Sequence, residues 1–499
     1  MNAVTPLRAA GPQLALRFGI RFEDLHSNEG LARLDLLFLD YLGGRDAALR
    51  AQLINARHAP DALARKAESE LLIVLAGQLE AFLAQLFDLE AEVRALSKRH
   101  LQLAPLYRCK RQFVQRKAMI AHKTEEATRF DGAALEHLLV KWFAEPFSEL
   151  AFASHVQDWQ KDETANPEKL DCAMRYAAWA AHTPAGRARH AAGVLFKAPR
   201  KLDYHHLVPT ETRQQDGVIV HHLSHLRRRS GFALTDPGTD LVGALDQAHY
   251  CIFCHEQGKD SCSHGLKEKS GAFKNTIFGV PLAGCPLEER ISEFHKLKTE
   301  GFAIGALAMI CVDNPMVAAT GHRICNDCMK SCIYQKQEPV NIPQAETRTL
   351  KDVLALPWGF EIYSLLTRWN PLDLRRPLPK PASGRRVLIA GMGPAGFTLA
   401  HFLLNDGHTV IGVDGLKIEP LPAALSGVTE RGERVAFAPV FDVNEMYESL
   451  DSRLMAGFGG VAEYGITVRW DKNYLKVIRL LLERRAEFAM FGGVRFGSS

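Results

Sequence analysis

Cysteine is concentrated in one stretch of the chain, between residues 251 and 332. Eight of the ten cysteines lie there: Cys251, Cys254, Cys262, Cys285, Cys311, Cys325, Cys328 and Cys332. The N-terminus shows no secretory signal, and cytosolic thiols are kept reduced. Metal binding therefore explains this density of thiols better than disulfide bonds do, and the stretch is predicted to be a metal site.

The spacing of these cysteines discriminates between metals. Two C-x2-C pairs could supply the four ligands of a structural zinc: Cys251/Cys254 and Cys325/Cys328. The pairs are about 70 residues apart, and three cysteines would then have no role: Cys262, Cys285 and Cys332. A late cysteine followed by proline, as in Cys285-Pro286, is typical of iron–sulfur proteins. Two four-iron clusters, which seven thiols nearly fill, are favoured over zinc and over free thiols.

The composition of the 499 residues, 47% hydrophobic and 24% charged, is that of an ordinary soluble globular protein. The 61 basic and 57 acidic residues give a net charge of +4, too small to indicate a nucleic-acid partner. The most apolar stretch, residues 71–77, is too short to span a membrane. A cytoplasmic location is expected, and the oligomeric state is left open.

The N-terminal part, residues 1–240, is predicted to be a helical domain of unassigned role. Apolar residues recur every three or four positions over three segments: 61–98, 133–143 and 171–181. His221 and His225 lie four apart and would share one helix face as metal ligands, although surface histidines are the simpler interpretation. Cys109 and Cys172 stand alone, as small buried thiols do.

Three further segments complete the expected organisation. Residues 241–369 form a helical domain around the metal site. Residues 370–384 contain four prolines, which indicates a stiff linker between domains. Residues 385–499 begin an α/β domain of the Rossmann type. The expected fold class is therefore multidomain, with two helical regions followed by an incomplete α/β domain.

A second signature follows the linker directly, in RRVLIAGMGPAGFTLAHFLLNDGHTVIGVD at residues 385–414. It predicts a strand, a GxGxxG turn, a helix and a second strand: 387–390, 391–396, 397–404 and 409–413. Gly391 permits the tight turn, Gly393 lets a pyrophosphate approach the backbone, and Gly396 lets the helix pack on the strand. Asp414 stands where an acid meets a ribose hydroxyl. A dinucleotide site is predicted, and glycine spacing alone does not decide between FAD and NAD(P).

Together the two signatures resemble the glutamate synthase small subunit and the N-terminal half of dihydropyrimidine dehydrogenase. In that family a cysteine-rich helical domain with two [4Fe–4S] clusters precedes an FAD domain with a GPAG turn, into which an NADPH domain is inserted. The resemblance runs from about residue 243 to the C-terminus. These motifs carry it: Cys285-Pro286, Asp313-Asn314-Pro315, residues 321–332, residues 391–396 and the segment Gly459-Gly460 to Ile466.

The resemblance implies a set of ligands for each cofactor. One cluster would be held by Cys251, Cys254, Cys262 and Cys332. The other would be held by Cys285, Cys325 and Cys328, with a glutamine as fourth ligand, for which Gln344 is the candidate. FAD would be bound by Gly391, Gly393, Pro394, Ala395, Gly396, Asp414, Gly459, Gly460, Tyr464, Gly465 and Ile466. Cys311 falls outside this scheme and is expected to be an ordinary buried thiol.

The function implied by the resemblance is that of an FAD and iron–sulfur oxidoreductase. It would transfer electrons between NAD(P)H and an acceptor protein or domain. The chain stops after the helix expected at 473–485, near where the pyridine nucleotide domain of the family begins, so we expect a fragment or a donor site supplied by a partner. Two alternatives stay open: a non-catalytic electron-transfer or scaffold module, and a zinc-stapled nucleotide-binding protein. No acid–base constellation is found, and no catalytic residue is assigned.

Overall fold

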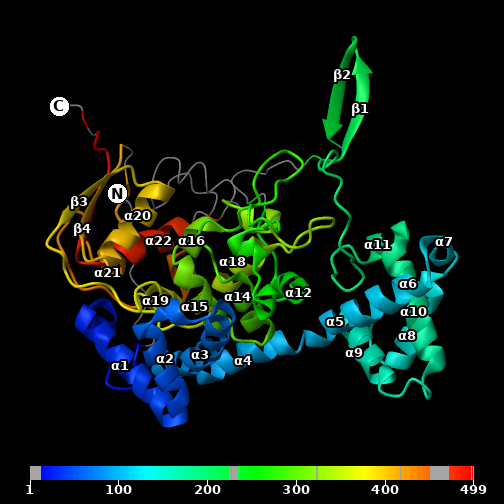
Figure 1. Cartoon of the computed structure of the whole chain (residues 1–499), viewed down its shortest axis with the longest axis horizontal. Coiled ribbons are helices and arrows are strands. Elements are labelled where there is room, and N and C mark those ends of the chain that lie inside the picture. The colour runs from blue at the N-terminus through cyan, green and yellow to red at the C-terminus, as the bar shows by residue number, and fades with distance from the viewer. Residues whose placement is uncertain are drawn as a thin grey trace.

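The structure is a computed structural model that describes residues 13–223, 226, 234, 236–321, 324–415, 418–449, 471, 473–495 and 497. Its parts follow one another along the long axis of the molecule (Figure 1). An α/β part lies at one end and the cysteine region in the middle, the first helices run beneath both, and a second helical unit lies at the other end. The expectation of a helical N-terminal region followed by an α/β part is confirmed.

The first helices begin at residues that can cap them. The Ser27 hydroxyl accepts a hydrogen bond from the Gly30 amide at 3.1 Å, and the Asp46 carboxylate accepts one from the Leu49 amide at 2.9 Å. The single helix expected at 61–98 is instead two helices, because Asp88 adopts a left-handed backbone conformation (φ +58°) between them. The four helices are α1 Asn28–Arg45, α2 Ala47–His58, α3 Arg65–Leu86 and α4 Glu90–Leu101.

Helix α3 is long and apolar enough, by length and composition alone, to cross a membrane. It packs as the core helix of a globular protein instead, against α15 (Ala303–Asp313). The backbones approach closely where Gly305 faces Ala76, because a side chain at Gly305 would press on the Ala76 carbonyl. The Glu80 Oε2 atom accepts hydrogen bonds from the amides of Ile304 (2.8 Å) and Gly305 (3.1 Å) and so caps α15. The first helices therefore share one hydrophobic core with the cysteine region.

The second helical unit has a hydrophobic core of its own. Its helices are α5 Ala104–Cys109, α6 Met119–Ala121, α7 Thr124–Ala127, α8 Gly132–Phe143, α9 Glu149–Gln160, α10 Pro167–His182 and α11 Pro184–Arg189. A nine-residue π-helical segment, Lys110–Ala118, joins α5 to α6. The helices expected at 133–143 and 171–181 are confirmed as α8 and α10, and Cys109 and Cys172 are buried.

A β-hairpin projects from the body of the molecule (Figure 1). Strands β1 (Thr210–Gln215) and β2 (Val218–Leu223) pair antiparallel. Asp216 (φ +51°) and Gly217 (φ +78°) form the turn, with the two positive φ values that a tight hairpin turn requires. The helical interpretation of His221 is wrong, because this residue lies in β2; His225 lies outside the described residues.

The cysteine region is built from helices joined by long loops. They are α12 Leu241–Tyr250, α13 Ser261–His264, α14 Ile291–Thr299, α15 Ala303–Asp313, α16 Val317–Thr320, α17 Asp327–Lys330, α18 Ile342–Leu354 and α19 Gly359–Leu366. Asp240 caps α12 by accepting from the Gly243 amide at 2.8 Å. In the proline-containing segment that follows α19, Leu372 and Leu374 are buried in the large core, whereas residues 380–386 are exposed.

The α/β part contains a parallel sheet with strand order β3-β4-β5. Its elements are β3 Arg386–Ala390, α20 Pro394–Asn405, β4 Thr409–Val413, α21 Ala423–Ser426, α22 Asn473–Glu483 and β5 Phe488–Phe491. The strand, turn, helix and strand expected from residue 387 onward are confirmed. A buried ion pair of 2.9 Å between Glu361 of α19 and Arg484, just after α22, ties this part to the cysteine region.

Candidate metal centre and nucleotide-binding turn

Four cysteines line one small pocket, and we call them the first group: Cys251, Cys254, Cys262 and Cys332. Cys251 follows the end of α12, Cys262 lies on α13, and Cys332 lies two residues beyond α17. The remaining wall is largely apolar: Ile252, Ile291, Ile333, Val340 and Ile342, with Ser261, Ser292, His295 and Tyr334. Residues far apart in the sequence therefore converge on a single thiol-lined space.

Burial dominates the electrostatics of the first group. Burial, followed by Asp260 and the neighbouring thiols, raises the pKa of the Cys262 thiol well above its usual value. The Cys262 sulfur donates a hydrogen bond to the Asp260 carboxylate at 2.9 Å. Burial, Asp260 and Cys332 raise the pKa of Cys254 to about 11. Protonated thiols of this kind become ligands when a cation replaces the protons, so metal binding and deprotonation are coupled here.

Backbone amides are directed at the sulfurs of the first group. The Phe253 amide donates to Cys251 Sγ at 3.4 Å, and Phe253 holds a left-handed conformation (φ +52°) in the loop between two of the cysteines. Burial raises the pKa of Cys332, and amide hydrogen bonds from Tyr334, Val340 and Ile333 oppose that rise. Amides donating to sulfur stabilise thiolate ligands and tune the potential of an iron–sulfur centre.

Three more cysteines, Cys285, Cys325 and Cys328, form the second group. Burial raises the pKa of Cys328, and the next causes are Glu346, Glu289, Cys285 and Cys325, all of which therefore lie near its sulfur. Cys285 is partly buried and Cys325 is exposed. The second group is therefore more open than the first.

Glu346 of α18 lies against the second group, and the sequence analysis did not identify it. Its Oε1 accepts a hydrogen bond from Asn314 Nδ2 at 2.6 Å, and burial raises its pKa to about 7. Burial and then Glu346 raise the pKa of Glu289 well above its usual value, so Glu289 keeps its proton and donates to Glu346. Gln344, the expected fourth ligand, is directed elsewhere, because its Oε1 accepts from the Thr239 amide at 2.8 Å.

The two groups are connected through the backbone. The Cys285 amide donates to the Cys262 carbonyl at 2.8 Å. The preceding Gly284 (φ +89°) donates its amide to the Ser331 hydroxyl at 3.0 Å and lies so close to Ser263 and Gly265 that no side chain would fit. The loops that carry the two groups are therefore packed directly against each other.

Seven cysteines are divided between the two groups and are not gathered around one ion. In the parts of the chain that the structure describes, no three His, Cys, Asp or Glu side chains are grouped as they would be around one ion. The two C-x2-C pairs belong to different groups, so they do not form one zinc tetrahedron. In a cubane cluster each ligand binds a separate iron atom, so the sulfurs stand farther apart than around one ion. Cys311 is buried within α15, as expected.

The glycine turn of the α/β part has the geometry that its sequence predicts. Gly391 has φ +99°, which favours glycine. A Cβ at Gly396 would collide with the Gly391 carbonyl, so only glycine lets α20 pack this closely on the turn. A Cβ at Gly393 would meet nothing within 4 Å, which leaves open space beside the backbone. The turn therefore offers an accessible backbone at the N-terminus of α20, a favourable position for phosphate.

Asp414 directly follows β4 and contacts the glycine turn through Met392. Its Oδ2 accepts a hydrogen bond from the Met392 amide at 2.9 Å, and its own amide donates to the Phe491 carbonyl at 3.0 Å. Pro394 and Ala395 form the first turn of α20. The remaining expected flavin contacts lie outside the described residues: Gly459, Gly460, Tyr464, Gly465 and Ile466.

Comparisons with known proteins match part of the chain to one described family and longer stretches to individual proteins. Residues 16–88 match the family described as the RP005 N-terminal alpha-helical domain. The chain is 30% identical over 302 residues to the uncharacterized protein RP005 of Rickettsia prowazekii, covering 58% of this chain and 99% of RP005. It is 53% identical over 182 residues to the uncharacterized protein RP006 of the same organism, covering 36% of this chain and 24% of RP006.

A further relative carries the name of an enzyme subunit. The chain is 30% identical over 135 residues to the glutamate synthase [NADPH] small chain of Mycobacterium tuberculosis, covering 26% of this chain and 25% of that protein. The chain thus spans about a quarter of RP006 and of this small chain, but nearly all of RP005.

Proposed function

The chain belongs to the family of the Rickettsia protein RP005, and we propose that it is an iron–sulfur and flavin oxidoreductase that transfers electrons between NAD(P)H and an acceptor protein or domain. The observation that carries the proposal is the division of seven cysteines into two adjacent groups, four around one pocket and three beside Glu346. Seven thiols and one carboxylate are eight donors, the number that two [4Fe–4S] clusters take. The similarity to the NADPH-dependent small chain supports a redox role.

Each cluster has a proposed set of ligands. The first group supplies four thiolates: Cys251, Cys254, Cys262 and Cys332. The second supplies Cys285, Cys325, Cys328 and, as fourth ligand, the carboxylate of Glu346, which lies near the Cys285 and Cys328 sulfurs. Gln344 is the competing candidate and would have to release the Thr239 amide to reach the group.

The glycine turn is the proposed site of the pyrophosphate of FAD. The amides at the start of α20 and the open space at Gly393 would receive the phosphates. Asp414 would orient the adenosine ribose after exchanging its hydrogen bond from Met392. The contacts expected from the Gly459 to Ile466 segment stay predictions.

The positions of the parts support an order of electron carriers. A flavin exchanges electrons in pairs with a pyridine nucleotide and singly with iron–sulfur clusters. The second group lies on the side of the α/β part: Asn314 bonds both Glu346 (2.6 Å) and Thr320 (3.2 Å), and Thr320 ends α16, which packs on α22. This position supports a proposed order in which the second group exchanges electrons with the flavin, and the buried thiols of the first group would keep its cluster away from water.

The test is the metal and flavin content of anaerobically purified protein. We expect about eight irons and eight acid-labile sulfides per chain, with a flavin absorption spectrum from the released cofactor. NADPH-dependent reduction of an artificial dye is measured in parallel. Iron and flavin without dye reduction would support an electron-transfer module that needs a partner for NAD(P)H. Zinc without iron or flavin would overturn the proposal.

A further inference from the structure

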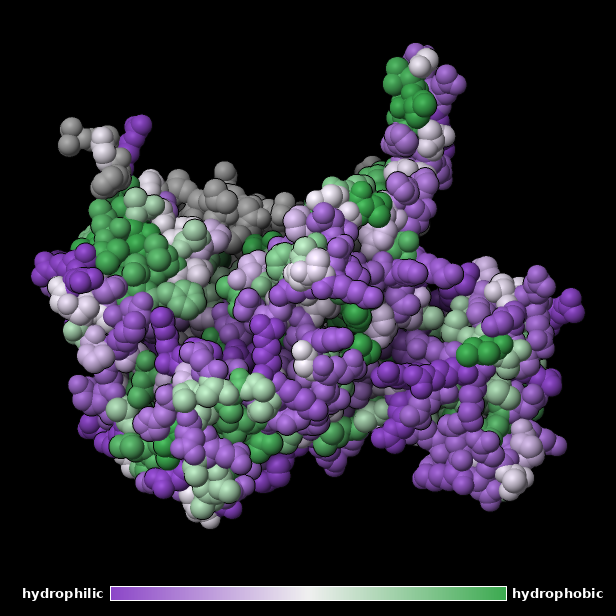
Figure 2. Space-filling view, in the orientation of Figure 1, coloured by the Kyte–Doolittle hydropathy of each residue, from purple (hydrophilic) through white to green (hydrophobic). Residues whose placement is uncertain are grey.

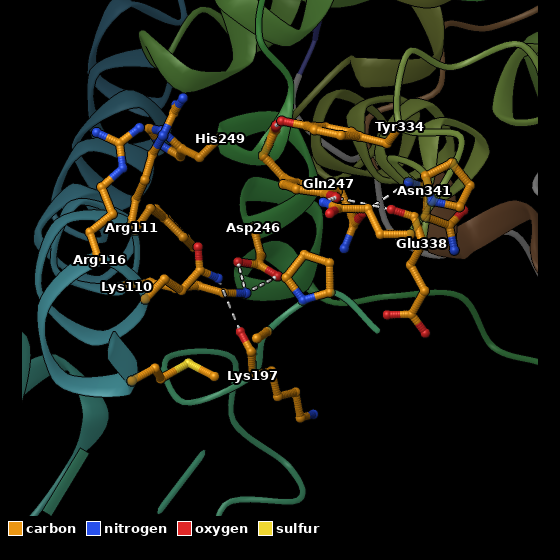
Figure 3. Close-up of a pocket in the computed structure, with 18 of the residues that line it drawn as sticks. Lys110, Arg111, Arg116, Lys197, Asp246, Gln247, His249, Tyr334, Glu338 and Asn341 are labelled. Carbon is orange, nitrogen blue, oxygen red and sulfur yellow. Dashed lines mark hydrogen bonds and ion pairs between the residues drawn. The ribbon is translucent and has the colours of Figure 1, made fainter. Parts of the chain in front are cut away.

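A large cavity opens between the second helical unit and the cysteine region (Figure 3). Its volume is about 700 Å³, within the range of small-molecule sites. One wall comes from the end of α5 and the π-helical segment Lys110–Ala118, and the other from α12 and residues 329–341. None of its residues is a proposed cluster ligand or part of the glycine turn, and only Tyr334 is shared with the pocket of the first group, so the cavity needs an explanation of its own.

The cavity carries an excess of positive charge. Four basic side chains line it against two acidic ones: Lys110, Arg111, Arg116 and Lys197 against Asp246 and Glu338. Both acids are already paired, Asp246 with Lys110 at 2.6 Å and Glu338 with Arg200 at 2.7 Å. Within the described part of the chain, no carboxylate lies within ion-pair distance of the Arg111 or Arg116 guanidinium. These two groups are therefore available to an anion.

The basic side chains of one wall are carried by an unusual backbone segment. The segment Lys110–Ala118 is π-helical over nine residues, whereas π-helix usually appears as a single turn and often at functional sites. Figure 3 shows Lys110 reaching Asp246 of α12, with Arg111 and Arg116 on the same side as Lys110 and near His249, and with Tyr334, Glu338 and Asn341 on the opposite side of the cavity. Arginine binds phosphate through two parallel hydrogen bonds, and two arginines on one wall make a strong phosphate site.

Flat rings line the same cavity. Tyr250 and Tyr334 stack with centroids 4.4 Å apart and an angle of 2° between their planes, and Tyr107 stacks on His249 at 4.6 Å and 18°. Burial and the charges of Arg108 and Arg111 lower the pKa of His249 to about 4, so its imidazole is neutral at pH 7. The cavity thus combines cationic donors with neutral aromatic faces.

The cavity also adjoins the first cysteine group. Tyr334 lines both this cavity and the pocket of the four thiols, and Tyr250 directly precedes Cys251. A ligand in the cavity would therefore lie one side chain away from the first group.

We propose that this cavity binds an organic phosphate that carries a flat ring, with the phosphate on Arg111 and Arg116 and the ring beside the Tyr250–Tyr334 pair. The ligand is bound without covalent change. The proposal does not depend on the clusters or on FAD, because it stands on the shape, charge and rings of the cavity alone.

The test measures binding of 1-naphthyl phosphate to the full chain by titration calorimetry, and variants of the cavity arginines separate binding there from binding at the glycine turn. Inorganic phosphate lacks the ring, and 1-naphthol lacks the phosphate. We expect 1-naphthyl phosphate to bind at least about tenfold more tightly than either control, as a charge-assisted contact and a stacking contact each predict. Equal affinity for inorganic phosphate, or for 1-naphthol, or no binding at millimolar concentration, would overturn the proposal.

A pair of adjacent basic residues provides the matched variants. Arg116→Ala removes a residue of the cavity, whereas Lys117→Ala removes a neighbour that is paired with Glu163 at 2.9 Å and does not line the cavity. Arg116→Ala and Arg111→Ala should each weaken 1-naphthyl phosphate binding about tenfold, and Lys117→Ala by less than about twofold. An equal loss in Arg116→Ala and Lys117→Ala would show nonspecific attraction and contradict the proposal.

A second measurement needs no variant. Phenylglyoxal modifies exposed arginines, and 1-naphthyl phosphate should protect Arg111 and Arg116 from it, as read by peptide mass spectrometry. Arg108, which does not line the cavity, should react equally with and without the probe. Absence of protection at both arginines would count against the site even if every variant failed to fold.

Discussion

The two cysteine groups differ in their neighbouring side chains and in exposure, although the Cys262 carbonyl and the Cys285 amide join them directly. The first group has four buried thiols in an apolar pocket. The second has three thiols, one of them exposed, beside a buried pair of glutamates. A carboxylate ligand and greater exposure alter the potential of a cluster. Two adjacent centres can therefore differ in redox behaviour through their surroundings alone.

The largest expected effect is the loss of the iron held by one cysteine group when a single thiol of that group is replaced. Cys262→Ser and Cys325→Ser should each lower the iron content from about eight to about four per chain, because each belongs to a different cluster. Cys311→Ser should leave iron unchanged, because Cys311 is buried in α15, outside both groups. The measurement is iron and acid-labile sulfide. Unchanged iron in both Cys262→Ser and Cys325→Ser would refute the division into two groups.

The next prediction concerns the fourth ligand of the second group. Glu346→Ala should remove iron from that group, whereas Gln344→Ala, two residues away on α18, should retain it. The physical reason is that Glu346 lies near the Cys285 and Cys328 sulfurs, while Gln344 holds the Thr239 amide. The reverse result, iron lost only in Gln344→Ala, would restore the glutamine implied by the family resemblance.

The difference in exposure can be measured on iron-free protein. Cys325 should react with iodoacetamide at least about tenfold faster than Cys262, because alkylation requires an accessible thiolate and only Cys325 is exposed. Burial also raises the pKa of Cys262 well above its usual value. Peptide mass spectrometry gives both rates in one sample, with buried Cys311 as an internal slow reference. Comparable rates at Cys262 and Cys325 would show that the two groups do not differ in this way.

The smallest expected effect concerns Glu80 of α3, which caps α15. Burial raises the pKa of Glu80 to about 7, and the amides of Gly305 and Ile304 oppose the rise. Glu80 in the folded chain therefore keeps its proton up to about pH 7, whereas in the unfolded chain it loses it near pH 4.5. Its contribution to stability is full below pH 4.5 and falls by about 3 kcal/mol as pH rises to 7.

Glu80→Gln should remove this fall. The free energy of unfolding of the wild type, relative to Glu80→Gln, should decrease by about 3 kcal/mol between pH 4.5 and pH 7.5. Glu70→Gln changes an exposed glutamate of the same helix and should show no such trend. A parallel pH dependence in the wild type and Glu80→Gln would contradict the buried, protonated state of Glu80.

Features set by local sequence could be predicted well. The glycine turn is an example, because the roles of Gly391 and Gly396 depend on backbone conformation and on contacts within six residues. The strands that flank the turn and the end of α20 before Gly407 (φ +80°) depend on equally local signals. The hairpin could have been found in the same way, because Asp216-Gly217 followed by the β-branched run 218–220 is a strong turn signal.

Features set by helix orientation could not be predicted from composition or spacing. Gln344 and Glu346 are two residues apart and so face different directions on α18, and only the packing of α18 against Asn314 and Glu289 selects Glu346. The π-helical wall of the cavity likewise has no pattern of its own in the sequence. The charge of the cavity arises only when that wall meets α12 (Figure 3).

The projecting hairpin has a consequence for how the chain tolerates change in length. Its strands are almost fully exposed, and Figure 2 shows apolar and polar side chains side by side along the projection. None of the residues that the structure describes between 197 and 240 belongs to either hydrophobic core. Insertions or deletions at Asp216-Gly217 would leave both cores intact, since loop tips accept added residues at small entropic cost. This position is therefore suited to carrying an affinity tag or a fluorescent reporter without disturbing the two cysteine groups.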